Sequence, residues 1–248
     1  MVRGFLIAIQ FLTRLPVPRS LVGTEGEIGQ AVAFFPLVGI VVGGGGALLY
    51  AVLSRFLPAT TCVLLVLIYS ALITNAFHED GLADSLDGFG GGWNKDETLN
   101  IMRDSRIGTF GALGLIFLVL AKYNLLSMLD SQQMWRWLIV AHTASRWTVV
   151  PLCLWLPYAR EQGQGGLVAR RVSRRAVLIA TLTLAVVLLL LPWPVAFVAL
   201  AITAAVVIIS GSYYRYRLNG ITGDCLGATN QLVEVALYFT GVILSKIK

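Results

Sequence analysis

The sequence has few charged residues and few of the side chains that build disulfides or zinc sites. Among its 248 residues only 13% are Asp, Glu, Lys or Arg, whereas 57% are hydrophobic, and the mean hydropathy is +0.78. A soluble globular domain carries about 25% charged residues, so this composition excludes that class and indicates an integral membrane protein. Cys62, Cys153 and Cys225 show no paired spacing, which argues against a disulfide framework or a zinc site.

Long apolar runs make up most of the chain. Each is close to the length that crosses a hydrocarbon core of about 30 Å. We therefore predict an all-α integral membrane protein, a single polytopic domain over 1–248 with about seven transmembrane helices. Pro192 and Pro194 predict a tight turn between the two shortest runs. The runs cover 28–53, 57–77, 108–129, 134–156, 177–191, 193–210 and 227–244.

The N-terminal run lacks a signal-peptide cleavage site. Arg3 precedes an apolar stretch at 4–13, but no small-residue site follows, and the chain continues as TRLPVP at 13–18. We expect a short interfacial or re-entrant helix that remains in the mature protein.

The net charge of +6 does not indicate nucleic acid as a partner, because the basic residues follow the expected membrane topology rather than forming a basic domain. If the segment 77–107 is cytoplasmic, so are residues 1–30 and the loops 157–176 and 211–226. These four segments hold nearly all the arginines, as the positive-inside rule requires. We expect a multi-pass protein of the bacterial cytoplasmic membrane, with lipid as a partner and its active site facing the cytoplasm.

The segment 78–88, which reads HEDGLADSLDG, is the strongest candidate site. On a helix Asp80, Asp84 and Asp87 stand at i, i+4 and i+7 and share one face. Like charges so close repel each other. The pattern therefore favours a bound hard cation, Mg²⁺ above all where a phosphate supplies further oxygen ligands.

Two neighbours of these aspartates are weaker candidates. Glu79 is a further candidate metal ligand. His78 points away from the Asp80, Asp84 and Asp87 face of a helix, so we assign it an orienting or acid–base role.

The segment 101–111 follows on the same predicted membrane face. Arg103 and Arg106 can present guanidinium groups to phosphate oxygens, and Asp104 can bind a metal, orient an arginine or accept a proton. The alternative is that the arginines only anchor a cytoplasmic loop. Together with the acidic segment this gives one active-site element at 78–111.

A second element is predicted at 219–231, which reads NGITGDCLGATNQ. Asp224 and the backbone at Gly223 can approach a phosphate or a metal closely, and Asn230 is a further candidate contact. The alternative is a turn in which Asp224 caps the following helix.

Charged residues also stand inside the apolar runs. A charge in the membrane is costly unless it is paired. We interpret Arg146 as a phosphate contact or as a structural partner of Glu234 or of the acidic helix. The four glycines at 43–46 lack the Lys-Ser/Thr of a phosphate loop and predict close helix packing.

The ordered set of motifs resembles the cobalamin synthase family, the adenosylcobinamide-GDP ribazoletransferases. DSLDG at 84–88 also matches the opening of the CDP-alcohol phosphotransferase motif, but the rest of that motif is missing. The cobalamin synthase resemblance covers almost the whole chain and rests on FLTRLPVP at 11–18, FPLVG at 35–39, the segments 78–88 and 102–111, SRW at 145–147 and the segment 220–230.

The resemblance implies an enzyme that joins adenosylcobinamide-GDP to α-ribazole or its 5′-phosphate. A ribazole hydroxyl attacks the phosphorus next to the cobinamide arm and GMP leaves. Mg²⁺ would be held by the aspartates of 78–88, and Asp104 or Asp224 would accept the proton. Arg103, Arg106 and Arg146 would bind phosphates.

Other functions remain open from the sequence. A cation transporter would use the acids as an ion site, although such sites are expected at mid-span. A different CDP-alcohol-type phosphotransferase and a non-catalytic scaffold for corrinoid-assembly enzymes are further alternatives. Whether those enzymes, or a second copy of the chain, are partners is also open.

Overall fold

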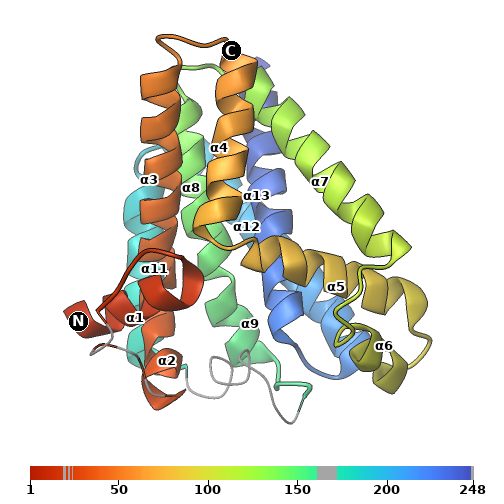
Figure 1. Cartoon of the computed structure of the whole chain (residues 1–248). Helices are drawn as coiled ribbons and strands as arrows, with labels where there is room; N and C mark the ends of the chain where they lie inside the picture. The colour runs from red at the N-terminus through yellow and green to blue at the C-terminus, as the bar shows by residue number, and fades with distance from the viewer. Residues whose placement is uncertain (19–20, 22, 24, 161–171, 247–248) are drawn as a thin grey trace.

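The computed structural model describes residues 1–18, 21, 23, 25–160 and 172–246 (Figure 1). In these residues all regular elements are helices, and Tyr158 and Ile221 form one isolated β-bridge. The all-α prediction is confirmed. The elements are α1 (Val2–Leu12), α2 (Glu25–Ala31), the 3-10 helix η2 (Val32–Phe34), α3 (Phe35–Leu53), α4 (Ala59–Ile73), α5 (Phe77–Gly91), α6 (Lys95–Ile101), α7 (Thr109–Met128), α8 (Met134–Trp147), α9 (Val149–Trp155), α11 (Arg174–Leu188), α12 (Trp193–Leu218) and α13 (Gly223–Lys246).

Three helices of the described chain are long and apolar enough to cross a membrane, and they cover Glu27–Leu53, Thr109–Met128 and Trp193–Leu218. A fourth span results if α4 and α5 are counted together as one bent element. The structure is thus consistent with a membrane protein but does not confirm seven spans. The N-terminal run forms the short apolar helix α1.

The predicted span 57–77 is not one straight helix. α4 ends at Ile73, and α5 leaves at an angle of 85°. At the corner Asn75 and Ala76 have φ values of 57° and 51°, a conformation uncommon outside glycine. Arg14 holds this corner, because its backbone N–H donates to the Ile73 carbonyl and its guanidinium to the Asn75 side chain. Hydropathy alone could not register a turn fixed by a distant segment.

The predicted span 134–156 is also interrupted, at Thr148 between α8 and α9. Pro151 has no N–H for the Trp147 carbonyl, and its ring crowds that carbonyl, which breaks the helix. Of the remaining runs, 177–191 forms the shorter helix α11, whereas 193–210 extends as α12 to Leu218 and takes up part of the predicted loop at 211–226.

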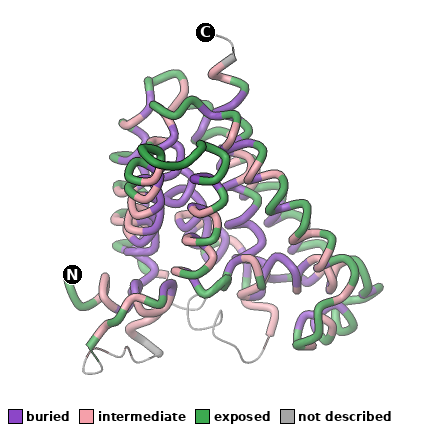
Figure 2. The backbone as a smooth tube through the Cα atoms, turned by 45° about the horizontal axis from the view of Figure 1, so that its top comes forward, coloured by how far each residue is buried: buried purple, intermediate pink, exposed green. Residues whose placement is uncertain are grey.

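α3 packs closely along α8, as the glycine run predicts. A Cβ built on Gly39 would lie 2.3 Å from the His142 carbonyl oxygen, and one on Gly43 would lie 2.5 Å from the Leu138 oxygen. These glycines therefore let the two backbones touch. In Figure 2 the buried backbone follows the inner helices, whereas the apolar residues along one side of α7 remain exposed, including Phe110, Leu113 and Phe117.

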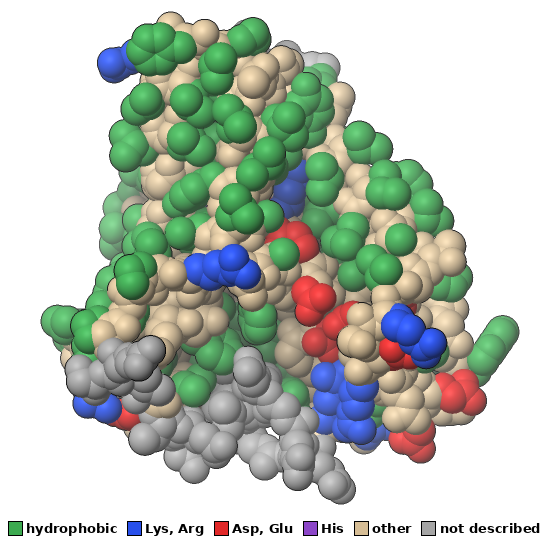
Figure 3. Space-filling model, in the orientation of Figure 1, with side chains coloured by type: hydrophobic (Ala, Val, Ile, Leu, Met, Phe, Trp, Pro, Cys, Tyr) green, Lys and Arg blue, Asp and Glu red, His purple; other side chains and the backbone are tan. Residues whose placement is uncertain are grey.

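The polar segments meet at one end of the molecule, the lower end in Figure 1. The Ala159 N–H donates to the Ile221 carbonyl, and the Arg217 guanidinium donates to the carbonyls of Phe89 and Gly92. Figure 3 shows Asp, Glu, Lys and Arg side chains concentrated in this half and hydrophobic side chains covering the other. The parts of the four predicted polar segments that the structure describes lie at this end, and residues 161–171 of the loop 157–176 lie outside the described residues.

Candidate active site

The two predicted site elements meet where α5 crosses α13. A Cβ built on Gly81 would lie 3.0 Å from the Asp224 carbonyl oxygen, and one built on Gly227 would lie 3.3 Å from the Gly81 Cα. The helices approach this closely because neither glycine has a side chain. The crossing sets Asp224, in the first turn of α13, beside the acidic face of α5.

Negative charge accumulates at this crossing. We treat α5 as lying outside the membrane-spanning segments, because it turns away from α4. Burial, together with the nearby charges of Asp80 and Asp224, raises the pKa of Asp84 to about 7. The side chains of Asp80 and Asp84 make no hydrogen bond or ion pair with another described residue. Asp80, Asp84 and Asp224 form what we call the acidic surface.

Arg160 is the cation that the described chain places on this surface. Its Nη2 donates to Asp224 Oδ2 at 2.7 Å, and the Thr222 hydroxyl donates to the same oxygen at 3.3 Å. Sequence analysis missed Arg160. Nothing in its spacing separates it from the other arginines of 157–176, and the contact is set by the pairing of residues 157–159 with Ile221.

Asp87 has a different environment. Its Oδ2 accepts the Gly108 N–H at 2.7 Å and its Oδ1 accepts the Gly111 N–H at 2.8 Å. A carboxylate is favourable there because the first turn of α7 has unpaired N–H groups and a positive dipole end. The structure therefore places Asp87 as the link between α5 and α7.

The loop before α7 carries the predicted phosphate-binding arginines. Arg106 pairs with Asp104 at 2.6 Å, and hydrogen bonds from Arg106 lower the pKa of Asp104 to about 2. Arg103 is exposed. The loop ends at the Gly108 contact with Asp87, so it is fastened to α5.

His78 and Glu79 lie on the inner side of α5 rather than on the acidic surface. His78 is buried, and its Nδ1 has no hydrogen-bond partner among the described residues. Glu79 lines a cavity of about 60 Å³ together with Lys122 and Glu234. The structure does not bring either residue to the three aspartates predicted as ligands.

The two predicted contacts on α13 lie at different depths. Gly223 begins the helix and, with His78, lines a cavity of about 30 Å³. Asn230 is fully buried, and its amide has no hydrogen-bond partner among the described residues. Gly223 directly precedes Asp224 of the acidic surface in the chain, whereas Asn230 lies about two turns further along α13 in the buried interior.

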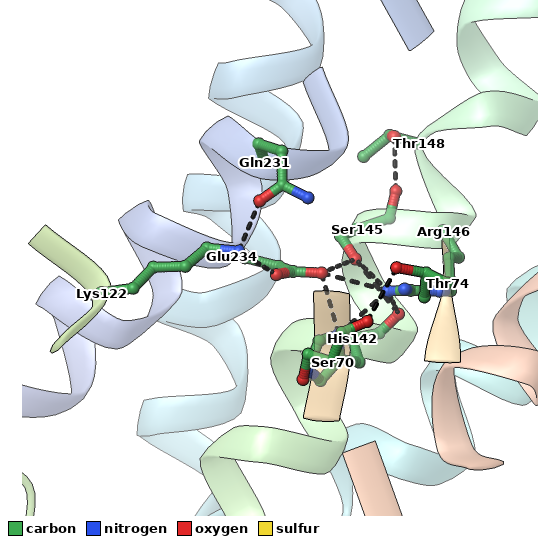
Figure 4. A network of polar contacts seen from close by, with 9 residues as sticks. All are labelled: Ser70, Thr74, Lys122, His142, Ser145, Arg146, Thr148, Gln231 and Glu234. Carbon is green, nitrogen blue, oxygen red and sulfur yellow. Dashed lines mark hydrogen bonds and ion pairs between the residues drawn. The ribbon is translucent and has the colours of Figure 1, made fainter. Parts of the chain in front are cut away.

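A buried ionic network lies deeper in the bundle (Figure 4). Glu234 pairs with Lys122 at 2.6 Å, with His142 Nδ1 at 2.9 Å and with Arg146 Nη1 at 3.1 Å. The Ser145 hydroxyl donates to Glu234 at 3.2 Å. Of the two interpretations of Arg146, the structure shows the ion pair with Glu234, which joins α8 to α13.

Comparison with known proteins decides the family. The sequence model of cobalamin-5-phosphate synthase matches residues 4–242. The chain belongs to the cobalamin-5-phosphate synthase family. A relative from Ralstonia nicotianae, named adenosylcobinamide-GDP ribazoletransferase, is 42% identical over 94% of this chain and 92% of its own length. Relatives of the same name from Vibrio cholerae and Shewanella baltica are 38% and 35% identical over 94% and 98% of the chain, and over 91% and 95% of their own lengths. No solved structure gives a significant match.

The acidic surface of this member of the cobalamin-5-phosphate synthase family is not a closed metal cage. Among the described residues, no three His, Cys, Asp or Glu side chains are arranged to hold a metal ion by themselves. Mg²⁺ is commonly bound by one or two carboxylates together with water and substrate phosphates. Asp80 and Asp84, whose side chains make no hydrogen bonds to the described residues, fit that kind of site.

Proposed function

We propose that this protein transfers the cobinamide phosphate of adenosylcobinamide-GDP to a hydroxyl of α-ribazole or its 5′-phosphate. The observation that carries the proposal is the convergence of Asp80, Asp84 and Asp224 at the α5–α13 crossing, in a chain of this family. Phosphoryl-transfer sites use carboxylates to hold a metal ion and arginines to bind phosphate oxygens.

The reaction balances without a redox partner or a covalent enzyme intermediate. The ribazole hydroxyl oxygen forms a bond to the phosphorus next to cobinamide, the bond from that phosphorus to the bridging oxygen breaks, and GMP leaves with that oxygen. The hydroxyl proton passes to a carboxylate and then to solvent.

Mg²⁺ is the metal ion we propose, with Asp80 and Asp84 as its protein ligands. The ion would supply charge neutralisation at the diphosphate and at the leaving phosphate. Asp87 is assigned to fastening α7, because both of its oxygens already accept backbone N–H groups.

Asp224 is our choice as proton acceptor. Burial raises its pKa, which suits a group that must take up a proton near neutral pH. Asp104 is a poorer acceptor because its pKa is about 2 and Arg106 pairs with it. Arg103 and Arg106, on the loop fastened to Asp87, are proposed to bind the diphosphate.

The arrangement of arginines supports an active site on the cytoplasmic side of the bacterial inner membrane. The acidic surface lies at the end where the arginine-bearing segments meet, and cytoplasmic loops are enriched in arginine. Substrates that are synthesised in the cytoplasm would reach the site there without crossing the bilayer.

The test is product formation by purified protein in detergent. With adenosylcobinamide-GDP, α-ribazole or its 5′-phosphate and Mg²⁺, we expect the joined cobamide and one GMP per product, with no membrane gradient. Folded protein that made no product, yet moved a cation across sealed vesicles, would establish the transporter alternative instead.

A further inference from the structure

Arg160 uses only part of its hydrogen-bonding capacity. Its side chain is 11% exposed, and Nη2 makes the 2.7 Å bond to Asp224. Its Nε is buried and has no hydrogen-bond partner among the described residues. A buried donor without a partner is unfavourable, so a partner that accepts from both Nε and Nη2 would be preferred to the single contact with Asp224.

The backbone fixes Arg160 beside the acidic surface. The Ile221 N–H donates to the Pro157 carbonyl at 2.9 Å, and the Ala159 N–H donates to the Ile221 carbonyl at 2.8 Å. A Cβ built on Gly220 would lie 2.5 Å from the Pro157 oxygen, so glycine is needed at this position. Arg160 is therefore tied to the segment that leads directly into Asp224.

Electrostatics makes an arginine at this position useful for binding a diphosphate. Asp80, Asp84 and Asp224 repel an incoming phosphate, and the guanidinium of Arg160, whose Nη2 lies 2.7 Å from Asp224 Oδ2, offsets part of that repulsion. The planar Nε and Nη donors of arginine match two oxygens of one phosphate. A phosphate therefore offers the two-point contact that Asp224 does not make.

We propose that Arg160 is a substrate-binding residue that pairs with Asp224 in the absence of substrate and binds a diphosphate oxygen pair when substrate arrives. The inference rests on the proposed function of the same site. Binding of the diphosphate would also release Asp224 from its ion pair at the moment when a proton acceptor is needed. Arg160 thereby couples substrate arrival to the freeing of Asp224.

Binding of GDP tests this role without requiring turnover. GDP carries a diphosphate like that of the substrate, and its Kd can be measured by calorimetry on full-length protein in detergent with EDTA. For Arg160→Gln we expect Kd to rise about tenfold or more, because a two-point charged contact is lost. Arg160→Lys keeps the charge but loses the planar guanidinium, so its Kd for GDP should lie between those of the wild type and Arg160→Gln. Arg174→Gln, at an exposed position on α11, is the control.

Asp224→Asn separates this role from a structural one. If Arg160 binds the diphosphate, removal of its competing carboxylate should leave GDP binding as tight as in the wild type or tighter. If Arg160 only orders the loop against Asp224, Asp224→Asn and Arg160→Gln should weaken GDP binding alike, which would overturn the proposal. Where Arg160→Gln does not fold, the test uses Arg160→Lys and Asp224→Asn. The Kd for GDP should rise in Arg160→Lys and should stay the same or fall in Asp224→Asn.

Steady-state kinetics distinguishes this inference from the proposed function. Arg160→Lys should raise KM for adenosylcobinamide-GDP and change KM for α-ribazole by less than about threefold. Wild-type protein without any turnover would contradict the proposed function. The Kd values for GDP would still test whether Arg160 binds a diphosphate. Active wild type together with unchanged KM and Kd in both Arg160 variants would contradict the role of Arg160 alone.

Discussion

Gly81 of α5 and Gly227 of α13 are in backbone contact, since a Cβ built on Gly227 would lie 3.3 Å from the Gly81 Cα. This contact brings Asp80 and Asp84, from one site element, to Asp224, from the other. The geometry of the acidic surface therefore depends on two residues that carry no functional group.

Gly81→Ala should lower turnover by about tenfold or more while the protein stays folded. The new Cβ would lie 3.0 Å from the Asp224 carbonyl oxygen, so the backbone of α13 must move away by a few tenths of an ångström. Small displacements of catalytic groups are costly to the reaction rate. Gly44→Ala is the matched control, because a Cβ there has nothing within 4 Å. Equal loss of activity in both variants would show that the α5–α13 crossing does not determine the rate of turnover.

Asp84 should make the metal-free protein less stable as pH rises. Its folded-state pKa is about 7, above the value of about 3.9 in an unfolded chain. The folded state therefore binds the Asp84 proton more tightly than the unfolded chain does. The stabilisation that results is complete below the unfolded-state pKa and is lost as pH rises through the folded-state pKa of about 7. In EDTA, Tm should fall between about pH 5.5 and pH 8.

Asp84→Asn should reduce that fall and raise Tm at the higher pH, because the amide stays neutral. Asp96→Asn, on the exposed first turn of α6, should leave the pH dependence unchanged. An Asp84→Asn protein with the wild-type dependence of Tm on pH would show that ionisation of Asp84 does not destabilise the folded protein.

Some of this architecture could be predicted from the sequence and some could not. The spacing of Asp80 and Asp84 fixes their shared helical face, and arginine counts place the polar segments at one end. The end of α4 at Ile73 could not be predicted, because Arg14 imposes it from a distant segment. The pairing of Arg160 with Asp224 likewise depends on backbone contacts between distant loops.

Two residues show why a motif does not assign individual roles. Asp87 continues the spacing of Asp80 and Asp84, yet it accepts two N–H groups of α7. Arg146 could serve a phosphate or a buried acid, and only the packing of α8 on α13 shows the pair with Glu234. Helical periodicity gives the face of a residue but not the partner that reaches that face.

The Glu234 network should be essential for stability. Glu234→Gln leaves Lys122 and Arg146 without their buried counter-charge, and breaking such a pair costs about 3–5 kcal/mol. We expect a large drop in Tm in detergent. Adding Arg146→Gln should cost less than the sum of the two single changes, because the pair is already broken. Additive losses would indicate that the two residues are not coupled.

Cysteine labelling tests the membrane orientation. In a variant without the three native cysteines, Lys95→Cys and Tyr216→Cys should resist an impermeant reagent in intact cells and react after lysis, because both exposed positions belong to the end expected in the cytoplasm. Arg55→Cys, in the connection between α3 and α4, should react in intact cells. Labelling of Lys95→Cys from outside would reverse the topology.

The most direct test of the account is the metal dependence of turnover in wild type and Asp84→Asn. Cobamide and GMP formation by the wild type should stop with EDTA and return with Mg²⁺ or Mn²⁺, whereas Ca²⁺ should serve poorly because its coordination is larger and looser. Asp84→Asn should be slower by about a hundredfold in saturating Mg²⁺, since it removes a ligand charge, while Asp96→Asn should match the wild type. Full turnover in EDTA, or wild-type turnover by folded Asp84→Asn, would contradict the central claim that Asp80 and Asp84 hold a metal ion for phosphoryl transfer.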